Sequence, residues 1–326
     1  MANYTSPKEE SAGKYACLLY DSTLKTVLGS VEDEQLYIEI IEFLIPGKHI
    51  SSITNMEKEK HGLVVSEKVV IFDLLCKDDI TGEEFLVEVQ NAPDGTYKDR
   101  ALYYSLVPIR EQLEKKRSEA GTEEEAKRRK MDYSLKPVYI ISLVNFGLKH
   151  ESAEALEDGY VSRYELRNGL NGEKMTEALN FVFVEMGRLP YSKDEADKCK
   201  TRLERFIFTF KYMHTFEEYP ASFEEDPLLE KLAKAAELAN MTVEQRAKYD
   251  SAMNDEFARL VETNYAREQA REEGLAEGRE KGRAEERMSF IATLHKKGYS
   301  ISEISSMTDI PEAEVFSYLE KAQTTS

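Results

Sequence analysis

The feature that most constrains the fold is an uninterrupted apolar run, PVYIISLV, at residues 137–144. The run is short and rich in β-branched and aromatic residues, which favour a strand. A strand whose side chains are apolar on both faces is buried on both faces, as in the interior of a sheet that helices cover on each side. The run therefore predicts an interior strand of a layered structure.

Strand and helix patterns alternate around this run, and the pattern after residue 193 is helical throughout. Strands are expected at 64–76, 85–90, 161–166 and 179–184, and helices at 11–30, 33–45 and 98–116. The fold class is therefore α/β, of a mixed α+β kind: a sheet flanked by helices, followed by an all-α C-terminal region. We expect a sheet-containing domain at 1–190, a helical region at 191–264, a Gly/Glu/Arg-rich helical or linker segment at 265–287 and a small helix-turn-helix-like tail at 288–326.

The net charge of -18 argues against a protein that coats nucleic acid nonspecifically. The charge is uneven, because residues 96–137 hold 11 basic and 8 acidic residues. Lysine and arginine at 115–117 and 127–130 dominate this segment. They either attract a polyanion or form the solvated ends of a charged helix or loop.

Composition also predicts the compartment. No run approaches 18 apolar residues, and the N-terminal residues 1–10 are polar, so neither a membrane span nor a signal core is expected. Cys17, Cys76 and Cys199 are far apart and odd in number, which fits neither a disulfide framework nor a zinc site. The sequence predicts a reduced, cytoplasmic protein without a membrane partner.

The stretch FLVEVQ at residues 85–90 resembles another buried strand, yet it carries two polar side chains. Because the side chains of a strand alternate between its faces, Leu86, Glu88 and Gln90 share one face. An ionised carboxylate in apolar surroundings is costly unless it is paired or binds a cation. The strand thus carries either a half-buried polar site or surface residues that face solvent.

A hairpin brings Asp73 toward the same face. Turn residues at 77–82 separate this strand from the preceding one, whose end is apolar except for Asp73. A turn centred on residues 80 and 81 places Asp73 opposite Glu88, with Cβ atoms about 5 Å apart, and a turn shifted by one residue makes them diagonal neighbours. Two carboxylates this close repel each other, so either one is protonated or a divalent cation lies between them. Their oxygen ligands suit Mg²⁺ or Mn²⁺.

These residues resemble the core of a known family. Asp73, followed by Glu88, Val89 and Gln90, is similar to the core of PD-(D/E)XK nucleases and more closely to the Rpn family of recombination-promoting nucleases, also described as transposases. In that branch Gln commonly stands where other nucleases carry Lys. Further similar blocks are DSTLKTVLG at 21–29, with Leu at both Phe positions, YKDRALYY at 97–104 and KPVYIISLVNF at 136–146. The resemblance covers roughly residues 15–190 and the style of the tail.

The resemblance implies a restriction-endonuclease-like mixed sheet and a metal-dependent DNA endonuclease. The implied catalytic residues are Asp73, Glu88 and Gln90, with Gln90 in the role of Lys. The implied ligands of Mg²⁺ or Mn²⁺ are Asp73, Glu88, the backbone carbonyl of Val89 and one of Asp21 or Glu39. The candidates for contact with DNA phosphates are Arg100, Lys115, Lys116 and Arg117. Arg100 fits equally a salt bridge that braces its helix.

Two functions follow from these observations. The first is a DNA endonuclease that hydrolyses phosphodiester bonds in recombination, a mobile element or defence, needs no small organic cofactor and forms a homo-oligomer. The second is a catalytically inactive nuclease-like protein that binds partners or assembles, which the strongly negative charge and the neutral Gln90 leave open.

The C-terminal tail leaves its own alternatives. Gly274, Gly278 and Gly282 lie four residues apart, on roughly one face of a helix. They predict either close approach of another helix or a charged linker. Residues 288–326 are typical of three short helices in a helix-turn-helix-like arrangement, which either contacts DNA or only packs.

Overall fold

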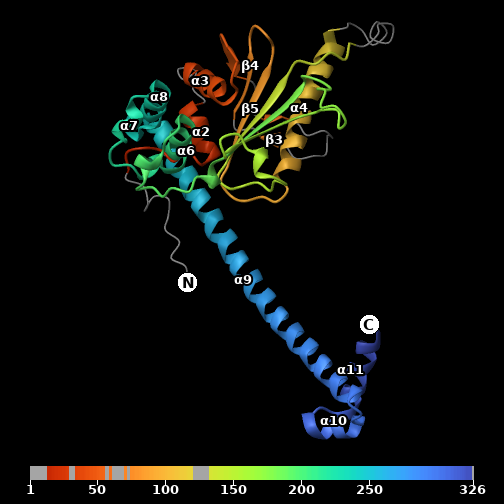
Figure 1. Cartoon of the computed structure of the whole chain (residues 1–326). Helices are drawn as coiled ribbons and strands as arrows, with labels where there is room; N and C mark the ends of the chain where they lie inside the picture. The colour runs from red at the N-terminus through yellow and green to blue at the C-terminus, as the bar shows by residue number, and fades with distance from the viewer. Residues whose placement is uncertain are drawn as a thin grey trace. The chain divides into compact units, whose positions relative to one another are not determined.

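The structure, a computed structural model, describes residues 13–28, 34–55, 59–60, 70–71, 74–119 and 132–324. The chain divides into two compact units, residues 1–257 and 258–326. Among the described residues, no helix is both long enough and apolar enough to cross a membrane. Figure 1 labels the main elements.

The elements of the first unit alternate as the sequence predicts. The described strands are β1 (Ile53–Asn55), β2 (Glu59–Lys60), β3 (Val70–Ile71), β4 (Leu74–Asp78), β5 (Glu84–Gln90), β6 (Val138–Val144), β7 (Val161–Glu165) and β8 (Leu179–Glu185). The described α-helices are α2 (Asp21–Leu28), α3 (Glu34–Leu44), α4 (Tyr97–Glu119), α6 (Arg202–Tyr212), α7 (Ala221–Glu224), α8 (Pro227–Ala236) and α9 (Val243–Lys296), which continues into the second unit. Short 3₁₀ helices lie at η2 (Ala153–Ala155), η3 (Met186–Arg188), η4 (Ala196–Lys198), η5 (Met213–Thr215) and η6 (Leu238–Asn240).

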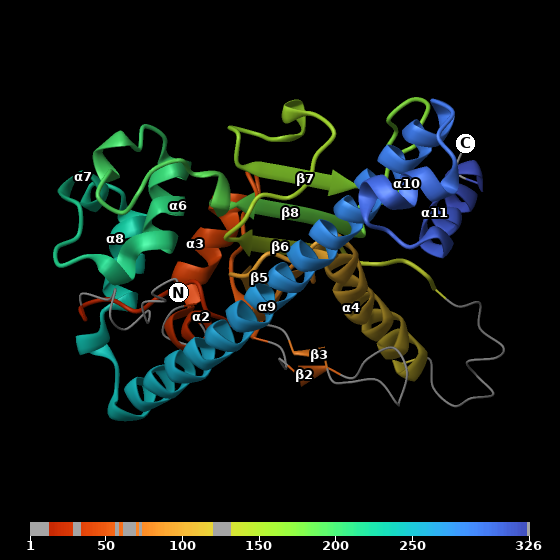
Figure 2. The same ribbon diagram turned by 90° about the horizontal axis from the view of Figure 1, so that it is seen from below.

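Within the described residues, six strands form one mixed sheet in the order β1-β4-β5-β6-β8-β7. The central strands β5, β6 and β8 run parallel, and β1, β4 and β7 pair antiparallel at the two sides. Figure 2 shows β5, β6, β8 and β7 side by side. The expected class, a mixed sheet flanked by helices with a helical C-terminal region, is confirmed.

Strand β6 occupies the centre of this sheet, as its apolar run predicts. All of its residues are buried, because β5 and β8 pair with it on either side and side chains pack on both of its faces. Tyr139 stacks on Phe85 of β5, with ring centroids 5.1 Å apart. The apolar run thus corresponds to a strand that is buried on both faces, and not to one with a buried and an exposed face.

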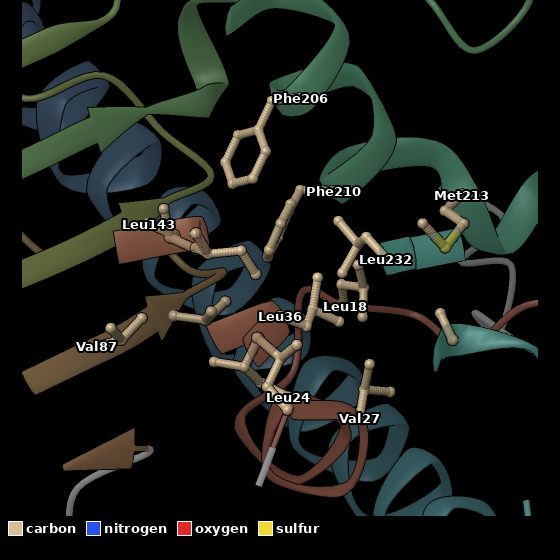
Figure 3. Packing of buried hydrophobic residues seen from close by; sticks show 14 of the residues in the cluster. Leu18, Leu24, Val27, Leu36, Val87, Leu143, Phe206, Phe210, Met213 and Leu232 are labelled. Atoms are coloured by element: carbon tan, nitrogen blue, oxygen red, sulfur yellow. The ribbon is translucent and has the colours of Figure 1, made fainter. Parts of the chain in front are cut away.

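Two hydrophobic cores lie on the two faces of the sheet. One joins Phe85, Val87 and Val89 to the helices α2, α3, α6 and α8, and part of it is drawn in Figure 3. The other joins Leu86 and Val144 to α4. Helices α6 and α8, which follow residue 190, thus share a core with the sheet. The division of the chain into the four expected segments, 1–190, 191–264, 265–287 and 288–326, stays a prediction.

Local signals explain where several helices begin. The hydroxyl of Thr201 accepts from the backbone N–H of Glu204, whose carboxylate accepts in return, and this capping box starts α6. Asp226 caps α8, whose first residue is Pro227. Such caps each contribute about 1 kcal/mol to helix stability.

Two expectations on local structure are corrected. The helix expected at 11–30 begins only at Asp21, because the chain before it pairs with the end of α8: the N–H of Ala16 donates to the carbonyl of Ala236 at 2.8 Å. The strand expected to end at Cys76 continues to Asp78, because β1 pairs with these last residues. Most of its expected beginning, at 64–69, lies outside the described residues.

The second unit contains residues 258–296 of α9 followed by α10 (Ile301–Thr308) and α11 (Glu312–Thr324). Ile291, Ile304 and Val315 form its small core. The expected capping box of Ser300 and Glu303 begins α10. The expected three short helices are therefore found, although the first is the end of a long helix that also contains the glycine-spaced segment.

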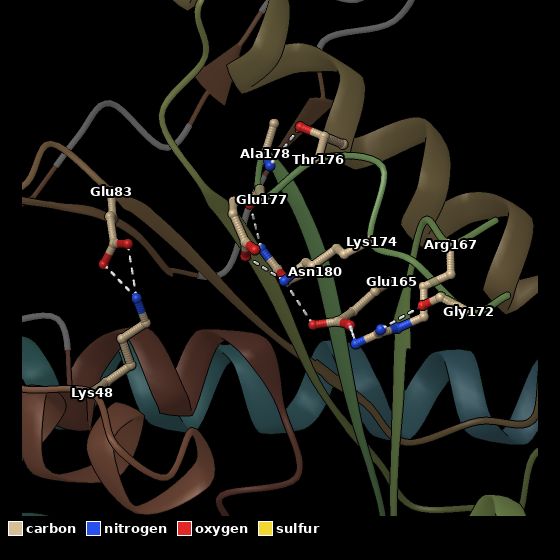
Figure 4. A network of polar contacts seen from close by, with 10 residues as sticks. All are labelled: Lys48, Glu83, Glu165, Arg167, Gly172, Lys174, Thr176, Glu177, Ala178 and Asn180. Carbon is tan, nitrogen blue, oxygen red and sulfur yellow. Dashed lines mark hydrogen bonds and ion pairs between the residues drawn. The ribbon is translucent and has the colours of Figure 1, made fainter.

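Ion pairs between charged side chains lie along the sheet. Lys48, in the loop after α3, pairs with Glu83 beside the hairpin turn at 2.8 Å. Lys174, between β7 and β8, pairs with Glu165 at the end of β7, also at 2.8 Å. Figure 4 shows both contacts. Because these side chains are partly exposed, each pair contributes at most about 1 kcal/mol.

Candidate active site

Strand β5 presents its polar side chains on the face that α4 covers. Val87 and Val89 belong to the core on the opposite face, whereas Leu86 belongs to the core beneath α4. Since side chains alternate, Glu88 and Gln90 project on the α4 side, and both are half-buried. This arrangement agrees with the half-buried alternative rather than with a fully solvent-facing pair.

The register of the hairpin is the first of the two that the sequence allows. Leu74 lies opposite Val87, and Leu75 lies opposite Leu86. This pairing corresponds to a turn centred on residues 80 and 81. Asp73 precedes Leu74 and lies outside the described residues, so its position relative to Glu88 stays a prediction.

Gln90 is held by an arginine from α4. The guanidinium of Arg100 donates through Nη2 to the amide oxygen of Gln90, and its Nη1 lies 3.1 Å from Asp94. The guanidinium also lies over the ring of Tyr97, 4.8 Å from its centroid. The amide nitrogen of Gln90 donates to the carbonyl of Ala92 at 3.3 Å. These contacts fix the orientation of the amide.

Asp94 holds both the arginine and the start of α4. Its Oδ1 accepts from the backbone N–H and the hydroxyl of Thr96, each at 2.8 Å. These hydrogen bonds, with a smaller contribution from the charge of Arg100, lower the pKa of Asp94 below its usual range. Arg100 therefore makes the salt bridge that was one of its two expected roles, and its contact with phosphate stays a prediction.

The two N-terminal acidic candidates differ in their surroundings. Asp21 is the first residue of α2, and its side chain lies outside what the structure describes. Glu39 accepts from Lys231 of α8 at 2.6 Å. Because α3 packs on the face opposite to Glu88, the structure does not bring Glu39 and Glu88 together.

The basic candidates at the end of α4 lie far from Gln90. The helix starts beside Gln90 and runs past Glu84 at the other end of β5, where Gln112 donates to the Glu84 carboxylate at 3.2 Å. At 1.5 Å per residue, residues 115–117 lie roughly 27–30 Å along the helix from its start at Tyr97. Lys116 donates to Asp132 at 2.6 Å and lowers the pKa of that carboxyl to about 2. The basic run at 127–130 lies outside the described residues.

Comparison with protein families decides the identity at family level. The model of the PD-(D/E)XK nuclease family transposases matches residues 18–266. The chain belongs to this family. The match contains the whole sheet and the helices on both of its faces. Searches of curated proteins and of solved structures each gave no significant match.

Membership in the PD-(D/E)XK nuclease family suggests a phosphodiesterase and implies DNA as its substrate. Nucleases of this family typically use divalent metals. Among the described residues, His, Cys, Asp and Glu nowhere gather in a group of three that could hold a metal ion. One expected ligand, Asp73, lies outside those residues, and the metal site stays a prediction.

The donors that the structure does describe fit a hard cation. The carboxylate of Glu88 is half-buried on the α4 face, and oxygen ligands of this kind bind Mg²⁺ and Mn²⁺. A buried hydroxyl, that of Ser142, lies on the neighbouring strand β6 in register with Glu88. The α4 face therefore carries the carboxylate of Glu88 and the hydroxyl of Ser142 on neighbouring strands.

Sequence reasoning missed a buried polar network at the end of β8. Glu185 is fully buried, and its carboxylate accepts from Arg188 at 2.6 Å and from the backbone N–H of Leu148 at 2.7 Å. His150 contacts the same carboxylate and the hydroxyl of Tyr164. Glu185 pairs with Val144, which pairs with Gln90, so all three residues lie at the carboxyl ends of the parallel strands. The signal is similar to that in β5: an acidic residue at or near the end of an apolar strand.

This network fixes the loop that follows β6. The N–H of Leu148 and the carbonyl of Leu148, which accepts from Arg188 at 2.6 Å, are both bonded within it. The same loop contacts the end of β5, because Asn145 donates to Asn91 at 2.9 Å. The network around Glu185 thus stabilises the loop beside the carboxyl end of β5, where Gln90 lies.

Proposed function

We propose that the chain is a DNA endonuclease that uses Mg²⁺ or Mn²⁺, held by Asp73, Glu88 and the carbonyl of Val89. The observation that carries this proposal is the register of β4 and β5: continued by one residue, it pairs Asp73 with Glu88. Membership in the PD-(D/E)XK family supports the same chemistry. One of Asp21 or Glu39 remains the proposed further ligand, and the surroundings of Glu39 favour Asp21.

The bound cation would polarise a phosphate and lower the pKa of a water. Glu88 would bind the cation through its carboxylate. Gln90 would direct its remaining N–H toward a phosphate oxygen, because its amide oxygen accepts from Arg100 and its other N–H donates to Ala92. Arg100 would supply, next to Gln90, the positive charge that Gln90 lacks.

The test is cleavage of supercoiled plasmid DNA by the full chain with and without Mg²⁺ or Mn²⁺. We expect cleavage only with the cation, and a loss of about 100-fold or more in Asp73→Asn and Glu88→Gln, since even the outer partners of metal ligands are worth 10–100-fold. Glu84→Gln is the matched control, because Glu84 lies on the same strand and face but bonds to Gln112. Metal-dependent cleavage that persists in both site variants would contradict the assignment.

The net charge of -18 favours the second candidate function, a catalytically inactive protein that binds partners or assembles, because it opposes DNA binding. Calorimetry distinguishes the two candidates. If millimolar Mg²⁺ and Mn²⁺ give no heat of binding, the second function holds. The homo-oligomer stays a prediction, and light scattering of the chain with and without residues 274–326 tests whether the tail forms it.

A further inference from the structure

Ser142 is a buried hydroxyl without an evident structural task. It lies in the middle of β6, its side chain is 0% exposed, and its Oγ has no hydrogen-bond partner within the part of the chain that the structure describes. Burying a hydroxyl without a partner costs free energy, and natural proteins rarely leave one unpaired. An alanine would occupy the same space without that cost. The hydroxyl therefore calls for a reason other than packing.

The neighbours of Ser142 indicate where its partner lies. On one side its register partner is Phe183 of β8, which offers only a ring. On the other side its register partner is Glu88 of β5. Paired residues of parallel strands share a face, and the strands lie about 4.8 Å apart. The polar neighbour in register with Ser142 is thus the carboxylate proposed to bind the cation.

A second serine provides an internal comparison. Ser162 of β7 pairs with the other side of Phe183 and is equally buried, at 1% exposed. Its hydroxyl donates to Glu185 at 3.2 Å. Two small residues therefore flank the same ring, and one of them bonds to an acidic residue. Ser142 likewise flanks Phe183, and Glu88 is its acidic neighbour on the strand at its other side.

We propose that Ser142 is a positioning residue for the metal site: its hydroxyl donates to the carboxylate of Glu88 when that carboxylate binds a divalent cation. This inference rests on the proposed function. A carboxylate that binds a cation through one oxygen keeps lone pairs on the other, and a donor there fixes its orientation.

This role predicts opposite effects of one substitution. Ser142→Ala removes a buried unpaired hydroxyl, so the melting temperature of the metal-free protein should stay the same or rise. It also removes the donor to Glu88, so the affinity for Mn²⁺ should fall by about 10-fold or more. If Ser142 only fills space beside Phe183, its substitution should not combine a retained melting temperature with a lowered affinity for Mn²⁺.

The experiment is calorimetric titration of the full metal-free chain with Mn²⁺, together with thermal melting without metal. Ser162→Ala is the control: it should melt at a lower temperature, because its hydroxyl is bonded, and bind Mn²⁺ like the wild type. Ser142→Cys, similar in shape but a weak donor, should bind weakly like Ser142→Ala. If Ser142→Ala does not fold, the cysteine variant decides.

The outcomes separate this inference from the proposed function. Suppose that Glu88→Gln loses Mn²⁺ binding while Ser142→Ala binds Mn²⁺ with wild-type affinity. The role of Ser142 is then overturned, and the proposed function survives. Where Ser142→Ala does not fold, the affinity of Ser142→Cys is used in its place. Undiminished binding in Glu88→Gln overturns both. Weak Mn²⁺ binding in Ser142→Ala with an unchanged or higher melting temperature supports the role of Ser142. Weak binding with a lower melting temperature, as is expected of Ser162→Ala, contradicts that role.

Discussion

At the scale of single residues, the uncharged Gln90 has a positively charged side chain next to it. Gln90 stands at the end of β5, and Arg100 reaches it from the next helix. Arg100 is itself fixed by Asp94 and by the ring of Tyr97. The positive charge therefore lies next to the glutamine with little freedom to move, which would suit the role proposed for Gln90 of directing its amide toward a phosphate.

This arrangement predicts the effect of removing the charge. Arg100→Gln should lower kcat/KM for DNA cleavage by about 10–100-fold, because a hydrogen bond to a charged group is worth about 1.5–3 kcal/mol. Mn²⁺ affinity should stay close to the wild type, since Arg100 does not bind the cation. Arg110→Gln, on the same helix but paired with Glu114, is the control. Full activity in Arg100→Gln would show that the guanidinium only braces α4.

Asp94 predicts a pH dependence of stability. Its pKa is lowered, mainly by the hydrogen bonds from Thr96. A lowered pKa contributes stability that is present above the unfolded value, about 3.9, and that is lost as the pH falls through the folded value. Asp94→Asn should therefore be less stable than the wild type at pH 7, by under about 1 kcal/mol.

Urea denaturation at pH 7, 5 and 3 checks this expectation. The difference between wild type and Asp94→Asn should be the same at pH 7 and 5 and smaller at pH 3. A difference that grows toward pH 3 would mean that the carboxylate does not stabilise the folded state.

At the scale of elements, one glycine lets two segments meet. Gly187 follows β8, and a Cβ there would lie 2.3 Å from the Cα of Phe146. Gly187→Ala should destabilise the protein by about 1–3 kcal/mol or more, because backbone must move to admit the methyl group. It should also disturb the loop that contacts Asn91, and so reduce cleavage.

Gly278→Ala provides the contrast. Within its own unit a Cβ at this position meets no described atom within 4 Å, and alanine favours a helix interior by about 1 kcal/mol over glycine. Thermal melting and circular dichroism should show unchanged or higher stability and helix content. Equal effects of the two substitutions would contradict the packing at Gly187.

Elements whose cause is local could be predicted from the sequence. The burial of β6 follows from its own apolar run, and the turn residues limit the hairpin to two registers, of which the structure has the first. In that turn Asp78 accepts from the N–H groups of Ile80 and Thr81, and Gly82 has a φ of +72°. The sidedness of β5 likewise follows from alternation alone. These local causes gave the positions of Glu88 and Gln90.

Features that depend on contacts between residues far apart in the chain could not be predicted from the sequence. The segment before Asp21 is not helical, because Ala16 bonds to a residue more than 200 positions later, and no local pattern records that. His150 meets Glu185 across 35 positions. The hydroxyl of Ser142, which has no partner among the residues described, is recognised only once β6 has neighbours on both sides. The short edge strand β1 has too few residues for a periodic pattern.

At the scale of the whole molecule, the metal should stabilise the fold that binds it. A ligand at 100 times its Kd adds about 2.7 kcal/mol to the free energy of unfolding. For a unit of about 250 residues this corresponds to a rise of roughly 5–10 °C in Tm. We expect this rise with saturating Mn²⁺ in the wild type and in Glu84→Gln, and its absence in Glu88→Gln. An equal rise in Glu88→Gln would place the cation elsewhere.

The central claim is that a divalent cation binds between Asp73 and Glu88. The most direct test is anomalous scattering from crystals of the full chain grown with Mn²⁺. The account predicts an anomalous peak bound by the carboxylates of Asp73 and Glu88, on the α4 face of the sheet. A well-ordered site with no peak, or a peak held by other residues while these two carboxylates remain apart, would contradict it.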